Sequence, residues 1–179
     1  MAIAEFFSLL FLSLAFVLIS LIVKSRRTHV KIGQMAFKEI EKNISKIFTV
    51  LLISTFILIV ANVAGYYSGH EAIITSVVGF IIFTAIFYMP SAIVVDGKSI
   101  KRALKESIKL HSKEPQYFLI WLFSLIVIIS AVDLIVMALT GGAIFSSYIV
   151  LVIVSLFVLP YFVIFQAEAY MNKFKLLKH

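Results

Sequence analysis

Five long apolar blocks constrain the fold of this chain more than any other feature of its sequence. They cover about residues 3–23, 47–66, 73–95, 117–139 and 143–171. A helix needs roughly 20 apolar residues to cross the hydrocarbon core of a bilayer, and every block is long enough. A spanning segment must satisfy its own backbone hydrogen bonds, which a helix does. We therefore predict an all-α fold, a single integral membrane domain with five transmembrane helices.

Two charged segments between the blocks carry apolar residues at helical spacing. In residues 28–46, Phe37, Ile40 and Ile44 recur among Lys and Glu, and this segment is expected to continue into the second span. In residues 99–112, Ile100, Leu104 and Ile108 share one face, and basic residues fall largely on the other. The pattern predicts two amphipathic helices, and the second is typical of a helix that lies flat at the membrane surface.

The basic residues predict which side of the membrane each loop faces. Of the 16 Lys and Arg residues, seven lie between the first and second blocks, six between the third and fourth, and three after the fifth. The remaining loops and the N-terminal end contain none. Short loops rich in Lys and Arg stay in the cytoplasm. We therefore expect a protein of the cell membrane with its N-terminus outside and its C-terminus and both amphipathic helices on the cytoplasmic side. Because no basic residue precedes Lys24, the first block is expected to be a retained helix rather than a cleaved signal.

One stretch of sequence resembles a known family. The residues Pro90 to Asp96 (PSAIVVD), then Ala103-Leu104, Ser107 and the apolar run from Phe118 form the pattern. It is similar to the multi-pass membrane domain attached to some glycerophosphodiester phosphodiesterases, and to related bacterial and archaeal membrane proteins. The resemblance implies packed spans with amphipathic elbows on the cytoplasmic side. It implies no catalytic residues, since the chain contains no phosphodiesterase domain.

A candidate polar site lies in the outer third of the predicted membrane region. It consists of Asp133, Asn62, Glu5 and His70. Ionisable groups inside spans are costly and often functional, so this set is a candidate for handling a proton or a cation. The alternative is that Asp133 reaches water at the surface, or is protonated and hydrogen-bonded to a neighbouring helix.

Two prolines, Pro90 and Pro160, fall inside predicted spans. Broken helices mark binding sites in some transporters, so both are candidate hinges. The alternative is a static bend, which is the usual effect of a proline near the end of a span.

The basic residues of the second amphipathic segment are candidate contacts for lipid headgroups. They are Lys98, Lys101, Arg102, Lys105 and Lys109. Anionic headgroups attract such residues by about 1 kcal/mol for each basic side chain near the surface. The alternative is that the charges only set the topology. Membrane lipids are thus the expected partners, a protein partner or a second copy of the chain stays open, and no nucleic acid is expected because no binding motif is present.

No catalytic motif stands out in the sequence. There are no cysteines, and we find no nucleophile elbow, phosphate-binding loop, zinc motif or paired carboxylates. We therefore expect no enzyme, no metal and no cofactor. The first hypothesis is a non-enzymatic membrane protein whose basic elbows engage anionic lipid or a partner. The alternative is a small transporter or channel subunit that uses Asp133 and the proline-bent spans.

Overall fold

The fold is built from helices. The computed structural model describes residues 2–28, 35–142 and 145–172, with backbone only for residues 2–5 and 35–36, and these ranges contain eight α-helices, one π-helical segment and no strand. In chain order the elements are α1 (Ala2–Thr28), α2 (Met35–Ser68), α3 (Glu71–Ile86), α4 (Met89–Asp96), α5 (Ile100–Lys113), α6 (Pro115–Thr140), α7 (Ser146–Ile153), η1 (Val154–Val158) and α8 (Leu159–Asn172).

Five helical stretches are long and apolar enough to cross a membrane. They are Phe6–Thr28, Phe37–Ser68, Glu71–Asp96, Pro115–Thr140 and Ser146–Asn172. The predicted fold class, an all-α membrane bundle with five spans, is confirmed. From Met35 onward, the first amphipathic segment and the second span form one continuous helix, α2, of 34 residues, while residues 29–34 of that segment lie outside the described residues.

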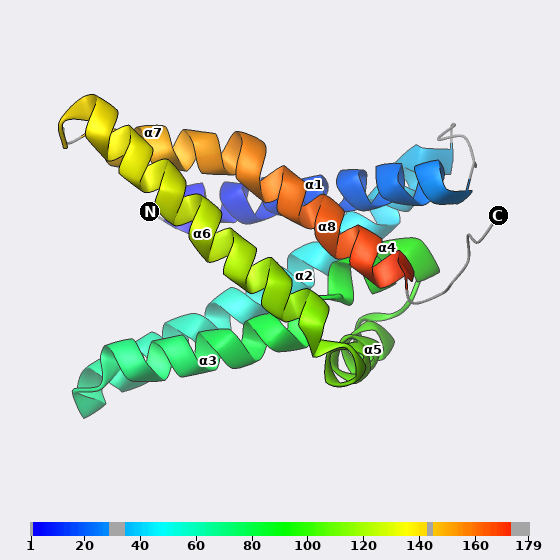
Figure 1. The fold of residues 1–179 in the computed structure, drawn as a ribbon. Helices are drawn as coiled ribbons and strands as arrows, with labels where there is room; N and C mark the ends of the chain where they lie inside the picture. The colour runs from blue at the N-terminus through cyan, green and yellow to red at the C-terminus, as the bar shows by residue number, and fades with distance from the viewer. Residues whose placement is uncertain (1, 29–34, 143–144, 173–179) are drawn as a thin grey trace.

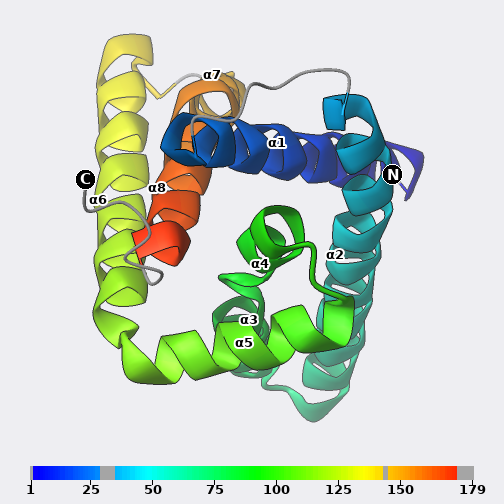
Figure 2. The ribbon, with the colours of Figure 1, turned by 90° about the vertical axis from the view of Figure 1, so that its right-hand side faces the viewer.

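The spans pack side by side, and two short helices close one end of the bundle. Figure 1 shows α2 and α3 as an antiparallel pair, with α1 beside α8 and α6 beside α7. In Figure 2, which looks at that end, α5 runs across the bundle from the side of α2 to the foot of α6, and α4 lies in the middle. Toward the opposite end, α6 and α3 diverge (Figure 1). Helices α6 and α3 are therefore close together at the α5 end and separate toward the other end.

A turn at Phe87 and Tyr88 divides the third span into α3 and α4. Pro90 follows this turn and occupies the first turn of α4. Proline has no N–H and would break a helix interior, but the first turn tolerates it because those N–H groups have no partner in the helix. Pro90 is thus the start of a new helix. At the other end, Gly97 adopts φ 65°, and this left-handed residue ends α4.

The fifth span is also irregular just before its proline. The segment η1 is a π-helix, in which the N–H of Leu159 donates to the carbonyl of Val154. Pro160 follows as the second residue of α8. Such a bulge relieves the clash that a proline ring makes with the preceding turn. Both predicted hinge residues therefore coincide with a departure from regular α-helix, while motion at these places stays a prediction.

Aromatic side chains form the core near the α5 end. Phe87 and Phe118 are each 1% exposed and pack edge to face with ring centroids 5.2 Å apart. Trp121 lies 5.0 Å from Phe83 and 5.3 Å from Phe162 by the same measure. These rings come from α3, α6 and α8, together with the turn before α4. Aromatic packing thus ties the spans together where they converge.

Candidate functional site

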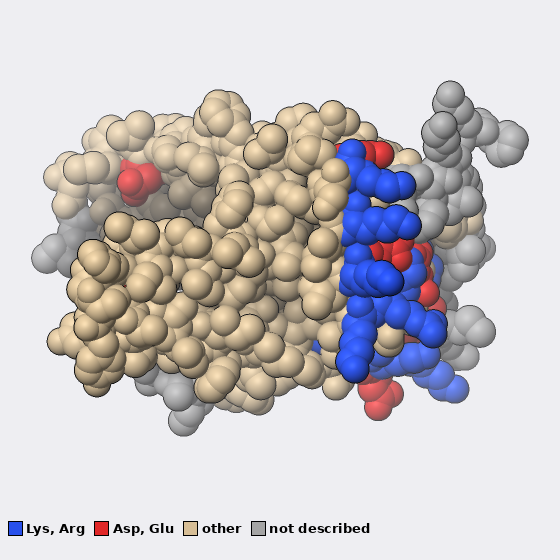
Figure 3. All heavy atoms as spheres, turned by 90° about the horizontal axis from the view of Figure 1, so that it is seen from below, with Lys and Arg blue, Asp and Glu red and all other residues tan. Residues whose placement is uncertain are grey.

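The Lys and Arg residues of the described ranges gather at the α5 end. Figure 3 shows Lys and Arg as one band at that end, with no basic side chain over the rest of the visible face. Helix α5 exposes Lys101, Arg102, Lys105, Lys109 and Lys113 and buries Ala103, Ser107 and Leu110. A shallow groove of about 390 Å³ runs along this basic face. The five residues predicted as headgroup contacts are therefore near one another, on α5 or just before it.

Lys98 differs from the other four because its ammonium group is bound by carboxylates of the protein. Its Nζ lies 2.5 Å from Oδ2 of Asp96 and forms a second ion pair with Glu106. The hydroxyl of Tyr170, which is 0% exposed, donates to the same Asp96 oxygen at 2.7 Å. Partial burial by itself would lower the pKa of Lys98, but the hydrogen bonds to Asp96 and Glu106 outweigh it and the pKa is raised. Lys98 thus links the α4–α5 connection to α5 and α8.

Other cations near the same end also bond to the protein. Arg27 pairs with Glu168 and donates to Oδ1 of Asn172 at 2.8 Å, which joins the end of α1 to the end of α8. Lys24 reaches the carbonyl of Val94 at 3.5 Å, near the C-terminus of α4. A cation there interacts favourably with the free carbonyls and dipole of a helix end.

In contrast, the outward-facing cations of α5 lack such partners. None of Arg102, Lys105 and Lys109 forms an ion pair with another residue of the described ranges. Their charge is therefore available to a ligand or a surface outside the protein.

The predicted polar site at the opposite end is not assembled as one group. The amide Nδ2 of Asn62 donates to Oε1 of Glu71 at 3.0 Å. Asp133 is exposed on α6, a helix that diverges from α2 and α3 toward this end, and it bonds to no other residue of the described part (Figure 1). The loop residue His70 is exposed, and the side chain of Glu5 lies outside the described residues. Asn62 is thus paired with Glu71, which was not among the predicted residues.

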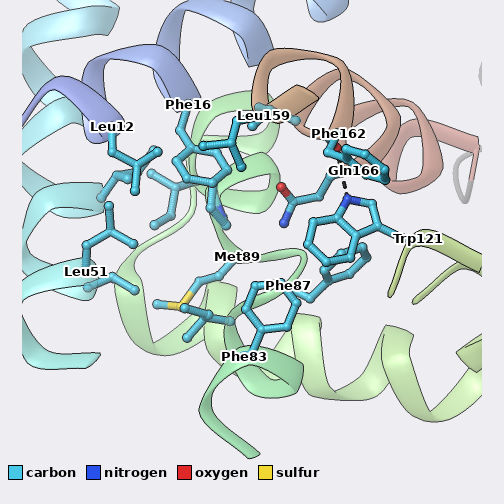
Figure 4. A pocket seen from close by; sticks show the side chains of 16 residues that line it. Leu12, Phe16, Leu51, Phe83, Phe87, Met89, Trp121, Leu159, Phe162 and Gln166 are labelled. Atoms are coloured by element: carbon cyan, nitrogen blue, oxygen red, sulfur yellow. Dashed lines mark hydrogen bonds between the residues drawn. The ribbon is translucent and has the colours of Figure 1, made fainter. Parts of the chain in front are cut away.

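A cavity of about 240 Å³ lies inside the bundle next to α4. Six helices form its walls, namely α1, α2, α3, α4, α6 and α8, and Figure 4 shows their side chains around it. The described residues that line it include no charged side chain. Phe16, Leu51, Met89 and Phe87 are typical of the lining, which is almost wholly apolar. The cavity is therefore a hydrophobic site in the middle of a membrane bundle.

Gln166 is the polar exception in this lining. Its side chain is 6% exposed and points into the cavity (Figure 4). Among the described residues its amide has no hydrogen-bond partner. The neighbouring Trp121 is satisfied, because its Nε1–H donates to the carbonyl of Phe162 at 3.1 Å.

The comparisons with known proteins leave the family open. No family model, no curated protein and no solved structure matches the chain. The resemblance to the membrane domain attached to phosphodiesterases therefore stays a prediction, and function must be argued from the residues themselves.

Three important residues were not singled out from the sequence. Gln166 is a neutral polar residue within the apolar run before Glu168, and it lies four residues after Phe162 on the same helix face. This isolated polar residue was the available signal. Glu71 and Tyr170 gave a weaker signal, because both lie at the ends of spans, where polar and aromatic residues are common.

Proposed function

We propose that this multi-pass membrane protein is non-enzymatic and binds anionic lipid headgroups through the basic face of α5. One contrast carries the proposal. Lys98 and Arg27 are neutralised by carboxylates of the protein, whereas Arg102, Lys105 and Lys109 are exposed without such a pair. Because α5 runs across the end of the spans, its cations lie at the depth of headgroups if the five apolar stretches fill the bilayer (Figure 2).

The side of the membrane is part of this proposal. The band of cations supports a cytoplasmic location for the α5 end by the positive-inside rule. The natural chain has no cysteine, so single cysteines at Ser112 and Ser68 can report on the two ends. Both side chains are exposed. An impermeant thiol reagent on intact cells should label only Ser68→Cys, and labelling of Ser112→Cys instead would reverse the orientation.

Headgroup binding can be tested with a charge-matched pair of variants of the full chain in nanodiscs. The test variant carries Arg102→Gln, Lys105→Gln and Lys109→Gln. The control carries Arg26→Gln, Lys38→Gln and Lys42→Gln, which removes three exposed cations from α1 and α2. Retention of phosphatidylglycerol over phosphatidylcholine is measured by native mass spectrometry.

We expect the α5 variant to lose most of the preference, since each basic residue contributes up to about 1 kcal/mol. The control should retain most of it. High salt should weaken the preference of the wild type, because exposed charges are screened. Equal retention by the two variants would show that α5 is not the binding face.

The alternative function, a transporter subunit, retains one supporting observation. The backbone departs from regular α-helix just before both Pro90 and Pro160. Asp133, however, lies on the exposed surface of α6 and does not line the described cavity. Proton and cation flux into proteoliposomes can be compared for the wild type and Asp133→Asn. Flux in the wild type that disappears in this variant would favour the alternative.

A further inference from the structure

We propose that the cavity next to α4 binds a neutral single-chain amphiphile, with its apolar chain in the cavity and its polar group hydrogen-bonded to Gln166. The inference goes beyond the proposed function, because the basic face of α5 takes no part in it. Its basis is Gln166, a residue that is more than nine-tenths buried. Its amide has no partner within the described part of the chain and is directed into an apolar space (Figure 4).

The lining determines the chemical class of the occupant. The walls are hydrocarbon and aromatic, so they favour an apolar chain. No charged residue lies in the described lining, and a buried ion without a counter-charge is strongly disfavoured. The polar group is therefore uncharged. An amide both donates and accepts hydrogen bonds, so a hydroxyl, a carbonyl or another amide would satisfy Gln166.

The volume limits how much of the chain is enclosed. A cavity of roughly 150 Å³ holds a six-carbon ring, so a cavity of about 240 Å³ has room for a chain of roughly ten carbons. A diacyl phospholipid is too large to be enclosed. Water is a poor alternative, because a buried water needs two to four polar partners and one amide cannot supply them across this space.

Trp121 makes occupancy directly measurable. It is the single tryptophan of the chain and forms part of the cavity wall. Bromine on a bound chain quenches tryptophan fluorescence on contact. The probes are bromodecanol, which carries the hydroxyl, and bromodecane, which does not. Both are added to the full-length protein in nanodiscs.

Filling the cavity tests whether binding occurs there. Val163→Phe adds a ring at a lining residue, and Val152→Phe makes the same change at an exposed position of α7. Leu51→Phe fills the cavity from the opposite wall, so the test remains decisive if Val163→Phe does not fold. We expect saturable quenching by bromodecanol in the wild type and in Val152→Phe, and at least roughly fivefold weaker binding in the filled variants. Equal, unsaturable quenching in all of them would overturn the proposal.

A second comparison tests the role of Gln166. Gln166→Leu keeps a similar size and removes the amide. We expect it to weaken binding of bromodecanol about fivefold, the usual contribution of one hydrogen bond, and to leave binding of bromodecane unchanged or stronger. If the variant affects both probes equally, Gln166 is not the polar anchor and that part of the proposal is wrong.

Discussion

The backbone N–H of Tyr88 donates a hydrogen bond to Oγ of Ser107, with 3.0 Å between nitrogen and oxygen. Tyr88 belongs to the turn between α3 and α4, and Ser107 lies on the buried face of α5, where it is 0% exposed. In an uninterrupted helix this N–H would bond to a carbonyl one turn earlier. The serine of α5 thus satisfies a donor that the break in the third span leaves free.

Replacing Ser107 by alanine should therefore destabilise the bundle. Ser107→Ala leaves the buried N–H of Tyr88 without this acceptor, and the expected loss is about 1–3 kcal/mol in the free energy of unfolding. The matched control is Ser112→Ala on the same helix, whose exposed hydroxyl donates only to the carbonyl of Ile108 among described residues. Denaturation of both variants in detergent, followed by Trp121 fluorescence, measures the difference. Equal stability would mean that the Tyr88–Ser107 bond contributes nothing.

The ion-pair cluster around Lys98 leads to a second prediction. Lys98→Met leaves Asp96 and Glu106 facing each other without their shared cation. Because the cluster is only partly buried, we expect a loss of roughly 1–2 kcal/mol, between the values for surface and buried pairs. Lys101→Met, at a nearby exposed cation of α5, should change stability by less than about 0.5 kcal/mol.

The same cluster predicts how stability depends on alkaline pH. The pKa of Lys98 is raised above its ordinary value of 10.5, so the charged form is favoured by folding. The stabilisation is then fully present below that value and is lost as pH rises through the higher folded pKa. Lys98 stays charged across the neutral range. Its contribution to the difference in unfolding free energy between the wild type and Lys98→Met should therefore not change with pH there. A difference that shrinks already near about pH 8 would contradict the raised pKa.

The sequence predicted the fold class because hydrophobic length is a strong local signal. The five apolar blocks correspond to the five helical stretches that are long and apolar enough to span a membrane. The division of the third span was harder to predict. A proline indicates a kink or a boundary, but tertiary contacts decide which one occurs, and here the acceptor Ser107 comes from another helix.

The candidate sites were less predictable because they depend on which helices become neighbours. Asn62 and Asp133 lie at similar expected depth, yet α2 pairs with α3 and not with α6. In the sequence, Lys98 is one of five equivalent cations. The structure distinguishes it, because Tyr170 and Glu106 lie beside its ammonium group. Gln166 became significant only when six helices enclosed a cavity around it. Depth in the membrane follows from sequence position, whereas contact between helices does not.

The close pairing of α2 and α3 gives a third prediction. A Cβ atom at Gly65 would lie 2.7 Å from the Cα of Glu71, which is too close for backbone atoms to accommodate without a shift. Gly65→Ala should therefore destabilise the hairpin by about 1–3 kcal/mol through overpacking. Gly79→Ala is the matched control, since its Cβ would meet only a Leu58 methyl at 3.5 Å. The control should be neutral or slightly stabilising, because alanine favours helix. Similar unfolding temperatures for the two variants would rule out the close contact at Gly65.

His111 gives the last prediction, which concerns acid pH. It lies in the last turn of α5, and its ring packs edge-on against Phe118 with centroids 4.6 Å apart. Burial lowers the pKa of His111 below its ordinary value of 6.5, and its Nδ1 has no partner among the described residues. Folding thus favours the neutral ring. The associated stability is present above about pH 6.5 and is lost as pH falls through the lower folded pKa.

The wild type should therefore lose stability between about pH 7 and about pH 5, and His111→Gln should lose less over the same interval. His70→Gln, at an exposed histidine between α2 and α3, should follow the wild type. Unfolding temperatures of the three proteins in detergent, read by Trp121 fluorescence, test this expectation. If His111→Gln follows the wild type across the interval, another group is responsible for the acid loss. The contact between α5 and α6 would then be insensitive to the charge on His111, contrary to the burial of its ring against Phe118.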